Sequence, residues 1–215
     1  MRFPGGSGFT VAGPFSGSLS NNGELFTLRG ANGGVIAQFT WSDIEPWPVD
    51  ADGGGYSLVL NNPAGSPTYG AGTAWRSSAQ TDGSPGGANS AVFTGSLTSD
   101  TDGDGLNDYL EYSMGSNPGD PESTASPVCN LVPYTVGGVT SLYLEFAFPR
   151  NLAADGVTYV PLLSSDLVTW TSAPSDVVYV GTHNNGDGTA TVTYRSAQPF
   201  TAAQPEEFFR LKVTQ

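Results

Sequence analysis

Apolar residues recur at every second position in most of the patterned segments of this chain, which is the period of a β-strand. The clearest run lies between residues 142 and 148, where the alternate positions are Leu142, Leu144, Phe146 and Phe148. The closing run 208–213 repeats the pattern with Phe209, Leu211 and Val213. Each run predicts a strand with one face turned toward a core.

Two pairs of such runs are separated by short turns rich in Gly and Asn, which is typical of β-hairpins. The first pair is 24–29 and 35–41, and the second is 176–182 and 189–194. In the last of these runs the apolar residues at 190, 192 and 194 alternate with threonines. We expect the apolar set to face inward and the threonines to face outward.

A helical period appears in one place. Leu106, Leu110 and Met114 are spaced four residues apart, so a short helix from about Asn107 would present them on one face. Gly115 follows directly and is suited to a left-handed helix cap. The sequence therefore predicts one short helix near the middle of the chain.

The segment that leads into this helix carries the most specific motif. Residues 100–111 read Asp-Thr-Asp-Gly-Asp-Gly-Leu-Asn-Asp-Tyr-Leu-Glu and fit the calcium-loop pattern D-x-[DN]-x-[DN]-G-x5-E at every specified position. The pattern predicts oxygen ligands from the side chains of Asp100, Asp102, Asp104, Asp108 and Glu111 and from the backbone carbonyl of Leu106. In this pattern Asp108 binds directly or through water, Glu111 binds with both oxygens, and Gly105 permits the sharp turn. We therefore predict one bound calcium ion.

A solvated turn of Asp and Gly residues without a metal is the alternative for this segment. It is disfavoured because all the specified positions of the pattern are filled. In addition, five carboxylates crowded together repel one another strongly without a cation.

The composition agrees with many short strands and turns. The 215 residues include 29 glycines and 16 prolines, and only 13% are charged. We predict an all-β fold, with two immunoglobulin-like antiparallel β-sandwich modules joined by a calcium loop with one short helix. The expected segments are 1–99, a partial module, then 100–122, the calcium loop and linker, and 123–215, the second module.

The charge distribution excludes some partners. The formal net charge is −13, and residues 100–122 hold seven acidic residues and no basic residue. No basic stripe exists to neutralise phosphates, so nucleic acid is not an expected partner. No apolar run approaches the ~20 residues that span a bilayer, so membrane insertion is not expected either. The first residues lack the apolar core of a signal peptide.

The chain shows no constellation for catalysis, and we expect it not to be an enzyme. His183 is the sole histidine, so any mechanism based on a Ser–His pair would need this residue, which lies beside a predicted turn. Cys129 is the sole cysteine, which excludes an internal disulfide. We expect it to be a buried, small apolar residue.

A carbohydrate-binding accessory module of a secreted polysaccharide-degrading enzyme is the alternative function. Its stacking platform would come from the four tryptophans, Trp41, Trp47, Trp75 and Trp170, together with tyrosines. Two small cores need aromatic residues in similar numbers. The solvent exposure of these rings distinguishes sugar binding from core packing, because two or three coplanar exposed rings would favour sugar binding.

Four short motifs mark the first segment. They are Gly-Pro-Phe-Ser-Gly-Ser-Leu-Ser-Asn-Asn-Gly-Glu at 13–24, Pro-Trp-Pro at 46–48, Asp-Gly-Gly-Gly-Tyr-Ser-Leu at 52–58 and Ser-Pro-Gly-Gly-Ala-Asn at 84–89. Together they resemble the C-terminal half of the lamin-tail domain of bacterial secreted proteins. The resemblance implies an immunoglobulin-like sandwich without catalytic residues, lacking the strands that normally precede Gly13.

The other two segments carry resemblances of their own. Residues 100–121 end in Gly-Ser-Asn-Pro-Gly-Asp-Pro and resemble one thrombospondin type 3-like calcium repeat with an EF-hand-like loop. Residues 164–171 and 208–213 are similar to C-terminal β-modules of large exported bacterial proteins. The three resemblances imply an extracellular or cell-surface protein of adhesion type. The implied partners are other modules of a longer parent chain and an extracellular glycan or protein.

An incomplete first module and an acidic linker predict an uncovered surface and a dependence on calcium. If half of the first sandwich is missing, the sheet expected from 25–29, 35–41 and 56–60 leaves an apolar face or a strand edge uncovered. The linker is short and acidic, so without metal it would repel itself. We therefore expect calcium to order the linker and to stiffen the junction between the modules.

Overall fold

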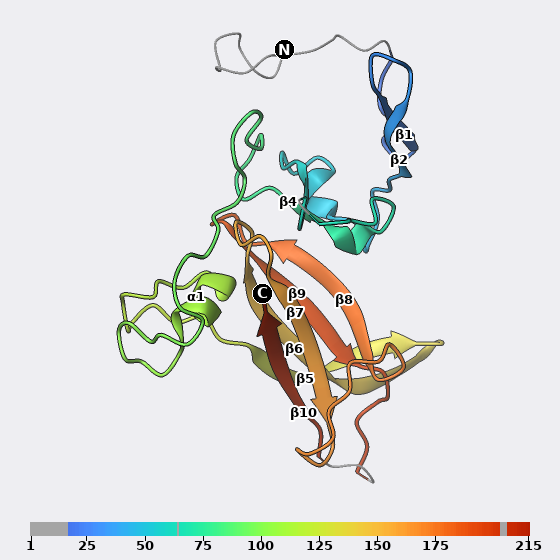
Figure 1. Cartoon of the computed structure of the whole chain (residues 1–215). Coiled ribbons are helices and arrows are strands. Elements are labelled where there is room, and N and C mark those ends of the chain that lie inside the picture. Colours follow the sequence, from blue (N-terminus) through green and yellow to red (C-terminus); the bar gives the residue numbers. More distant parts are fainter. Residues whose placement is uncertain (1–16, 64, 203–205) are drawn as a thin grey trace.

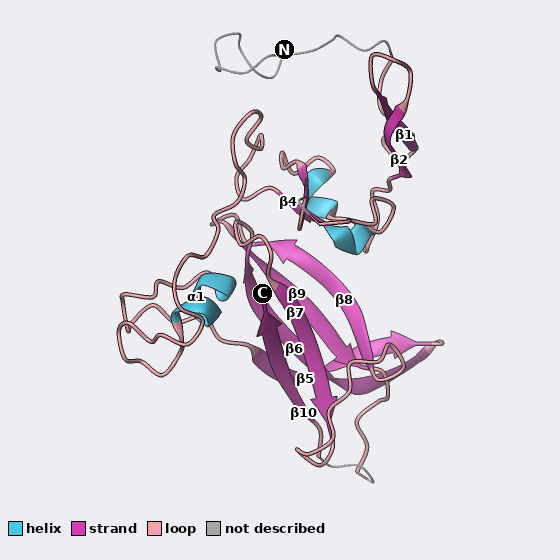
Figure 2. Ribbon diagram, viewed as in Figure 1, coloured by secondary structure: helices cyan, strands magenta, loops and turns pink. Residues whose placement is uncertain are grey.

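The computed structural model describes residues 17–63, 65–202 and 206–215, which consist mainly of antiparallel strands with one short α-helix (Figures 1 and 2). The strands are β1 (Leu25–Arg29), β2 (Val35–Thr40), β3 (Leu58–Leu60), β4 (Trp75–Ser77), β5 (Val128–Val136), β6 (Val139–Asn151), β7 (Thr158–Ser164), β8 (Val177–Asn184), β9 (Thr189–Ser196) and β10 (Phe208–Thr214). The helix is α1 (Asp108–Met114), and the 3-10 turns are η1 (Val49–Ala51) and η2 (Gly72–Ala74). The predicted all-β fold is confirmed.

The second half of the chain forms a β-sandwich. A four-stranded antiparallel sheet, ordered β5-β6-β9-β8, faces the antiparallel pair β7 and β10 (Figure 1). Phe146 of β6 stacks on Phe209 of β10 with ring centroids 5.0 Å apart, and Phe148 lies 5.8 Å from Tyr159 of β7. Because Phe146 and Phe148 are almost fully buried, these rings form the core between the two layers. The alternation at 146–148 and 208–213 therefore identified core positions correctly.

The predicted hairpin near the end of the sandwich is also present, as β8 and β9. Ala190 and Val192 of β9 are buried, and Tyr194 packs against the core. The threonines between them lie on the opposite face and are half-buried. The period of two in this run thus predicted which side chains face the core.

The first half of β6 departs from the predicted alternation. Leu142 is 45% exposed, whereas Tyr143 on the opposite face is only 5% exposed. The guanidinium of Arg195 lies 4.6 Å from the centroid of the Tyr143 ring, and Tyr134 meets that ring edge-on at 6.1 Å. These neighbours from β9 and β5 cover Tyr143, so an aromatic side chain is buried on the face opposite the core.

Cys129 is exposed, so the expectation of a buried apolar cysteine is wrong. The residue lies in β5, which is one of the two edge strands of its sheet and, among the described residues, pairs only with β6. Its register partner is the buried Phe146, but no strand covers the outer side of β5 in its sheet. The local sequence indicates a strand here but not its place at an edge, and an edge strand leaves its side chains more accessible.

Residues 17–99 contain two separate two-stranded sheets rather than one sheet of three strands. The hairpin of β1 and β2 is present as predicted, but β3 pairs with β4 and not with that hairpin. The expected three-stranded sheet is therefore wrong. Leu25 and Ile36 of the hairpin are 61% and 64% exposed. Part of the apolar surface of this hairpin is therefore uncovered.

Aromatic rings form the small core of residues 17–99. Trp75 lies 5.3 Å from Phe39 and 5.9 Å from Trp47, measured between ring centroids. Trp47 is buried, and Trp41, Trp75 and Trp170 are half-buried. Trp47 and Trp75 therefore contribute to this core.

Polar contacts join residues 17–99 to the sandwich. Arg76 is 3% exposed, donates to the Asn89 side chain at 2.7 Å and pairs with Asp155 at 3.1 Å. The backbone N–H of Asn184 donates to the Asp50 carboxylate at 3.1 Å. We call these five residues the junction. Hydrogen bonds satisfy both Nη atoms of the buried Arg76, whereas its Nε has no partner.

The tyrosines of the sandwich predict a dependence of stability on alkaline pH. Burial, together with a hydrogen bond to Glu145, raises the pKa of Tyr134 to about 12. Burial likewise raises the pKa of Tyr159 and Tyr179. The unfolded chain loses these protons near pH 10, whereas the folded chain keeps them.

The stability that these tyrosines contribute is therefore complete below about pH 10 and decreases as the pH rises through 12. An absorbance titration of tyrosinate should show ionisation in the native protein well above that of the denatured protein. The substitution Tyr134→Phe should remove part of the absorbance change that the native protein shows at the highest pH. Coincident native and denatured curves would contradict the burial of these hydroxyls.

Candidate metal centre

The acidic loop 100–107 leads directly into helix α1, which is capped at both ends. The Asn107 side chain caps α1 by accepting a hydrogen bond from the Leu110 N–H at 2.8 Å. At the other end Gly115 has φ 89°, and its N–H donates to the Glu111 carbonyl. The left-handed conformation favours glycine there. The predicted helix from about Asn107 to the Gly115 cap is thus confirmed, and it fixes the position of Glu111 relative to the loop.

The first three acidic side chains of the loop lie together. Asp100, Asp102 and Asp104 each offer a carboxylate oxygen, and these three oxygens lie within 4.8 Å of one another. The carboxylate of Asp100 accepts hydrogen bonds from the N–H groups of Gly103 at 2.8 Å and Gly105 at 3.1 Å. Gly105 has φ 98°, which a residue with a side chain rarely adopts. The backbone thus curls around the three carboxylates.

Two carboxylate oxygens in this region are buried and accept no hydrogen bond. They are Oδ2 of Asp102 and Oε2 of Glu111. Glu111 is 0% exposed, and its other oxygen accepts only a long hydrogen bond, 3.4 Å, from the Ser116 hydroxyl. Burial raises the pKa of Glu111, and the charges of Asp102 and Asp104 raise it further. A buried carboxylate among acidic neighbours lacks a positive partner, which a cation would supply.

Asp108 differs from the other predicted ligands because its carboxylate already has partners. It accepts hydrogen bonds from the Thr101 N–H at 2.8 Å and from the Thr101 hydroxyl at 2.7 Å. Its negative charge nevertheless contributes to the raised pKa of Glu111. Leu106 is half-buried, and its N–H donates to the Asp104 carboxylate at 2.7 Å. Asp108 therefore ties the start of the loop to the helix, whereas the triad and Glu111 present oxygens without full partners.

Helix α1 is anchored to the sandwich by backbone carbonyls near its end. The Asn151 side chain of β6 donates to the Tyr112 carbonyl at 2.8 Å, and the Tyr159 hydroxyl of β7 donates to the Ser113 carbonyl at 2.6 Å. The sequence reasoning missed Asn151 and Tyr159. No local signal could have identified them, because they lie far from the loop in the chain. They position the helix that carries Glu111.

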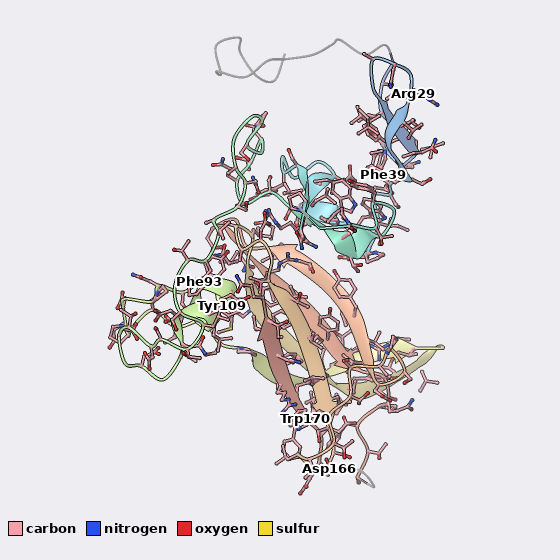
Figure 3. The ribbon with its side chains drawn as sticks, in the orientation of Figure 1. Arg29, Phe39, Phe93, Tyr109, Asp166 and Trp170 are labelled. Atoms are coloured by element: carbon pink, nitrogen blue, oxygen red, sulfur yellow. The ribbon has the colours of Figure 1, made fainter. Side chains whose placement is uncertain are left out.

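The other side of α1 contacts the segment that precedes the loop. Phe93 and Tyr109 point toward one another, with ring centroids 5.2 Å apart at a steep angle (Figure 3). The Tyr112 hydroxyl donates to the Ala91 carbonyl, and Ala91 forms a parallel bridge with Ala154. The helix thus lies between the sandwich and the end of residues 17–99, close to the junction.

No family model, curated protein or solved structure matches this chain. Among the residues that the structure describes, no helix is both long and apolar enough to cross a membrane. His183 is exposed near the end of β8. The strongest candidate site is the triad Asp100, Asp102 and Asp104, whose members Asp102 and Asp104 act through their charges on the buried Glu111.

Proposed function

We propose that residues 100–111 bind one calcium ion and that the ion fixes α1 against the sandwich. In this proposal the chain is a non-catalytic, calcium-stabilised part of an exported bacterial surface or adhesion-type protein. The observation that carries it is Glu111, a fully buried carboxylate with an oxygen that has no hydrogen-bond partner. It follows an acidic triad at the spacing of a calcium loop.

Calcium fits this donor set better than magnesium does. The candidate ligands are all oxygens and include four aspartates and one glutamate. Calcium accepts six to eight oxygen ligands in a flexible arrangement, whereas magnesium requires a small octahedral shell and retains several waters. A glutamate at the twelfth position that offers both oxygens is typical of a calcium loop. We therefore expect magnesium to compete poorly.

The location of α1 explains how a metal would act on the rest of the molecule. Glu111 is on the same helix as Tyr112 and Ser113, whose carbonyls accept hydrogen bonds from β6 and β7. A metal ion that holds Glu111 against the loop therefore also holds these carbonyls in place. An extracellular setting supports such a role, because millimolar calcium fills a site with a dissociation constant of about 10⁻⁴ to 10⁻³ M.

Calorimetry tests the proposed binding directly. Titration of calcium into the chain should release or absorb heat in the millimolar range with one ion bound per chain. The double variant Asp102→Ala, Glu111→Ala should give no binding isotherm. The absence of calcium heat in the unmodified protein, or equal binding by the double variant, would refute the proposal.

Limited proteolysis tests the proposed ordering effect. Addition of a chelator should increase cleavage within residues 97–122, because the acidic loop then loses the cation that holds it together. The turn between β8 and β9 provides an internal control, because it lies outside the metal loop. An unchanged cleavage pattern would show that the loop is ordered without metal.

A further inference from the structure

Arg150, near the end of β6, is a cation without an acidic partner. Its Nη2 donates to the Asn61 side chain at 2.6 Å, and its Cζ lies 5.4 Å from the centroid of the Tyr159 ring. Its Nε is buried and has no hydrogen-bond partner. Within the described residues, no carboxylate lies within ion-pair distance of this guanidinium.

The acidic residue near Arg150, Asp155, already has a partner. Asp155 pairs with Arg76 at 3.1 Å and acts on Arg150 only through its charge, without an ion pair. Burial lowers the pKa of Arg150, and the positive charge of Arg76 lowers it further. Arg150 is half-buried, and partial burial of a charge without a counter-ion is costly. This is unexpected in a chain with 20 acidic and only 7 basic side chains.

Arg150 borders a cavity of about 610 Å³, which we call the Arg150 cavity. One wall comes from residues 61–62 and 65–74, and the other comes from β6, β7, β9, the two residues before β7 and Gln215. The polar, uncharged side chains that line it are Asn61, Asn62, Ser66, Thr73, Thr158 and Gln215. The aromatic side chains that line it are Phe148, Tyr159 and Tyr194. Its volume lies within the range of small-molecule sites.

We propose that the Arg150 cavity binds a small sugar acid, whose carboxylate pairs with the Arg150 guanidinium. A guanidinium matches a carboxylate in shape and can form two parallel hydrogen bonds with it. The amide and hydroxyl groups of the walls suit the hydroxyls of a sugar, and the tyrosine rings suit its apolar face.

Other anions fit the cavity less well. A nucleotide or polyphosphate would bring several negative charges to a protein whose net charge is −13. The cavity offers one arginine to such a ligand and no helix N-terminus among its described walls. A bare carboxylate would leave most of the polar wall without a partner. The site therefore favours one negative charge combined with several hydroxyls.

Nuclear magnetic resonance with D-glucuronate tests this site in the full chain. Millimolar glucuronate should shift the Nε–H signal of Arg150 and the amide signals of Asn61 and Asn62. D-glucose, which lacks the carboxylate, and acetate, which lacks the hydroxyls, should each bind at least about tenfold more weakly. Equal shifts with acetate would refute a sugar acid, and no shift with glucuronate would refute the site.

The matched variants are Arg150→Lys and Arg210→Lys. Lysine keeps the positive charge but cannot form the two-pronged contact. Arg150→Lys should therefore weaken glucuronate binding at least about tenfold, whereas Arg210→Lys should leave it unchanged. Arg210 is exposed and stacks on Trp170 outside the cavity. Equal affinities of the two variants would show that Arg150 does not bind the carboxylate.

Discussion

Glu111→Gln is expected to stabilise the calcium-free protein and to remove most of the stabilisation that calcium adds. Without calcium, Glu111 is a buried carboxylate near three aspartates, and its raised pKa reports this unfavourable environment. Glutamine has nearly the same shape but no charge, so it relieves the repulsion. With calcium, the same substitution removes a charged ligand with two oxygens. The two effects therefore have opposite signs.

Thermal unfolding with and without calcium measures both effects. Calcium at one hundred times its dissociation constant stabilises a protein by about 2.7 kcal/mol. An affinity that is a hundredfold weaker reduces this to about 0.4 kcal/mol at the same concentration. Glu122→Gln is the matched control, because Glu122 is acidic, exposed and outside the loop motif. A Glu111→Gln protein with the full calcium response would exclude Glu111 as a ligand.

Phe148→Ala is expected to cause the largest loss of stability among single core substitutions in the sandwich, about 3–5 kcal/mol. The Phe148 ring is 2% exposed and packs against Phe146, Tyr159 and Tyr194, with centroid distances of 5.7, 5.8 and 6.2 Å. Removing it leaves a cavity between the two layers that these rigid rings cannot fill.

Chemical denaturation provides the measurement for Phe148→Ala. Val168→Ala is the control, because Val168 is 82% exposed and its truncation should change the free energy of unfolding by no more than about 0.5 kcal/mol. A loss below about 1 kcal/mol for Phe148→Ala would mean that the sandwich can collapse around the missing ring.

The parts of the structure that could be predicted from the sequence depend on neighbours in the chain. The β8–β9 hairpin, the cap at Gly115 and the inward positions of β9 follow from local spacing and turn chemistry. The clustering of Asp100, Asp102 and Asp104 follows in the same way, because alternate residues of one tight loop converge.

The remaining features depend on contacts between distant segments, which local patterns do not encode. The pairing of β3 with β4, the exposed Cys129 and the buried Tyr143 are set by which strand lies beside which. Asn151 and Tyr159 support the candidate site from strands far along the chain. The missing acidic partner of Arg150 becomes visible only when its spatial neighbours are known.

The polar character of the junction restricts how residues 17–99 can lie against the sandwich. Apolar surfaces can slide past one another with little change in free energy, whereas hydrogen bonds weaken steeply with distance and angle. The contacts of Arg76 with Asp155 and of Asn184 with Asp50 are therefore satisfied together in one orientation only. A small rotation would break them together and expose a buried guanidinium. The two parts of the chain consequently have one well-defined relative orientation, and they separate as a single event rather than by gradual drift.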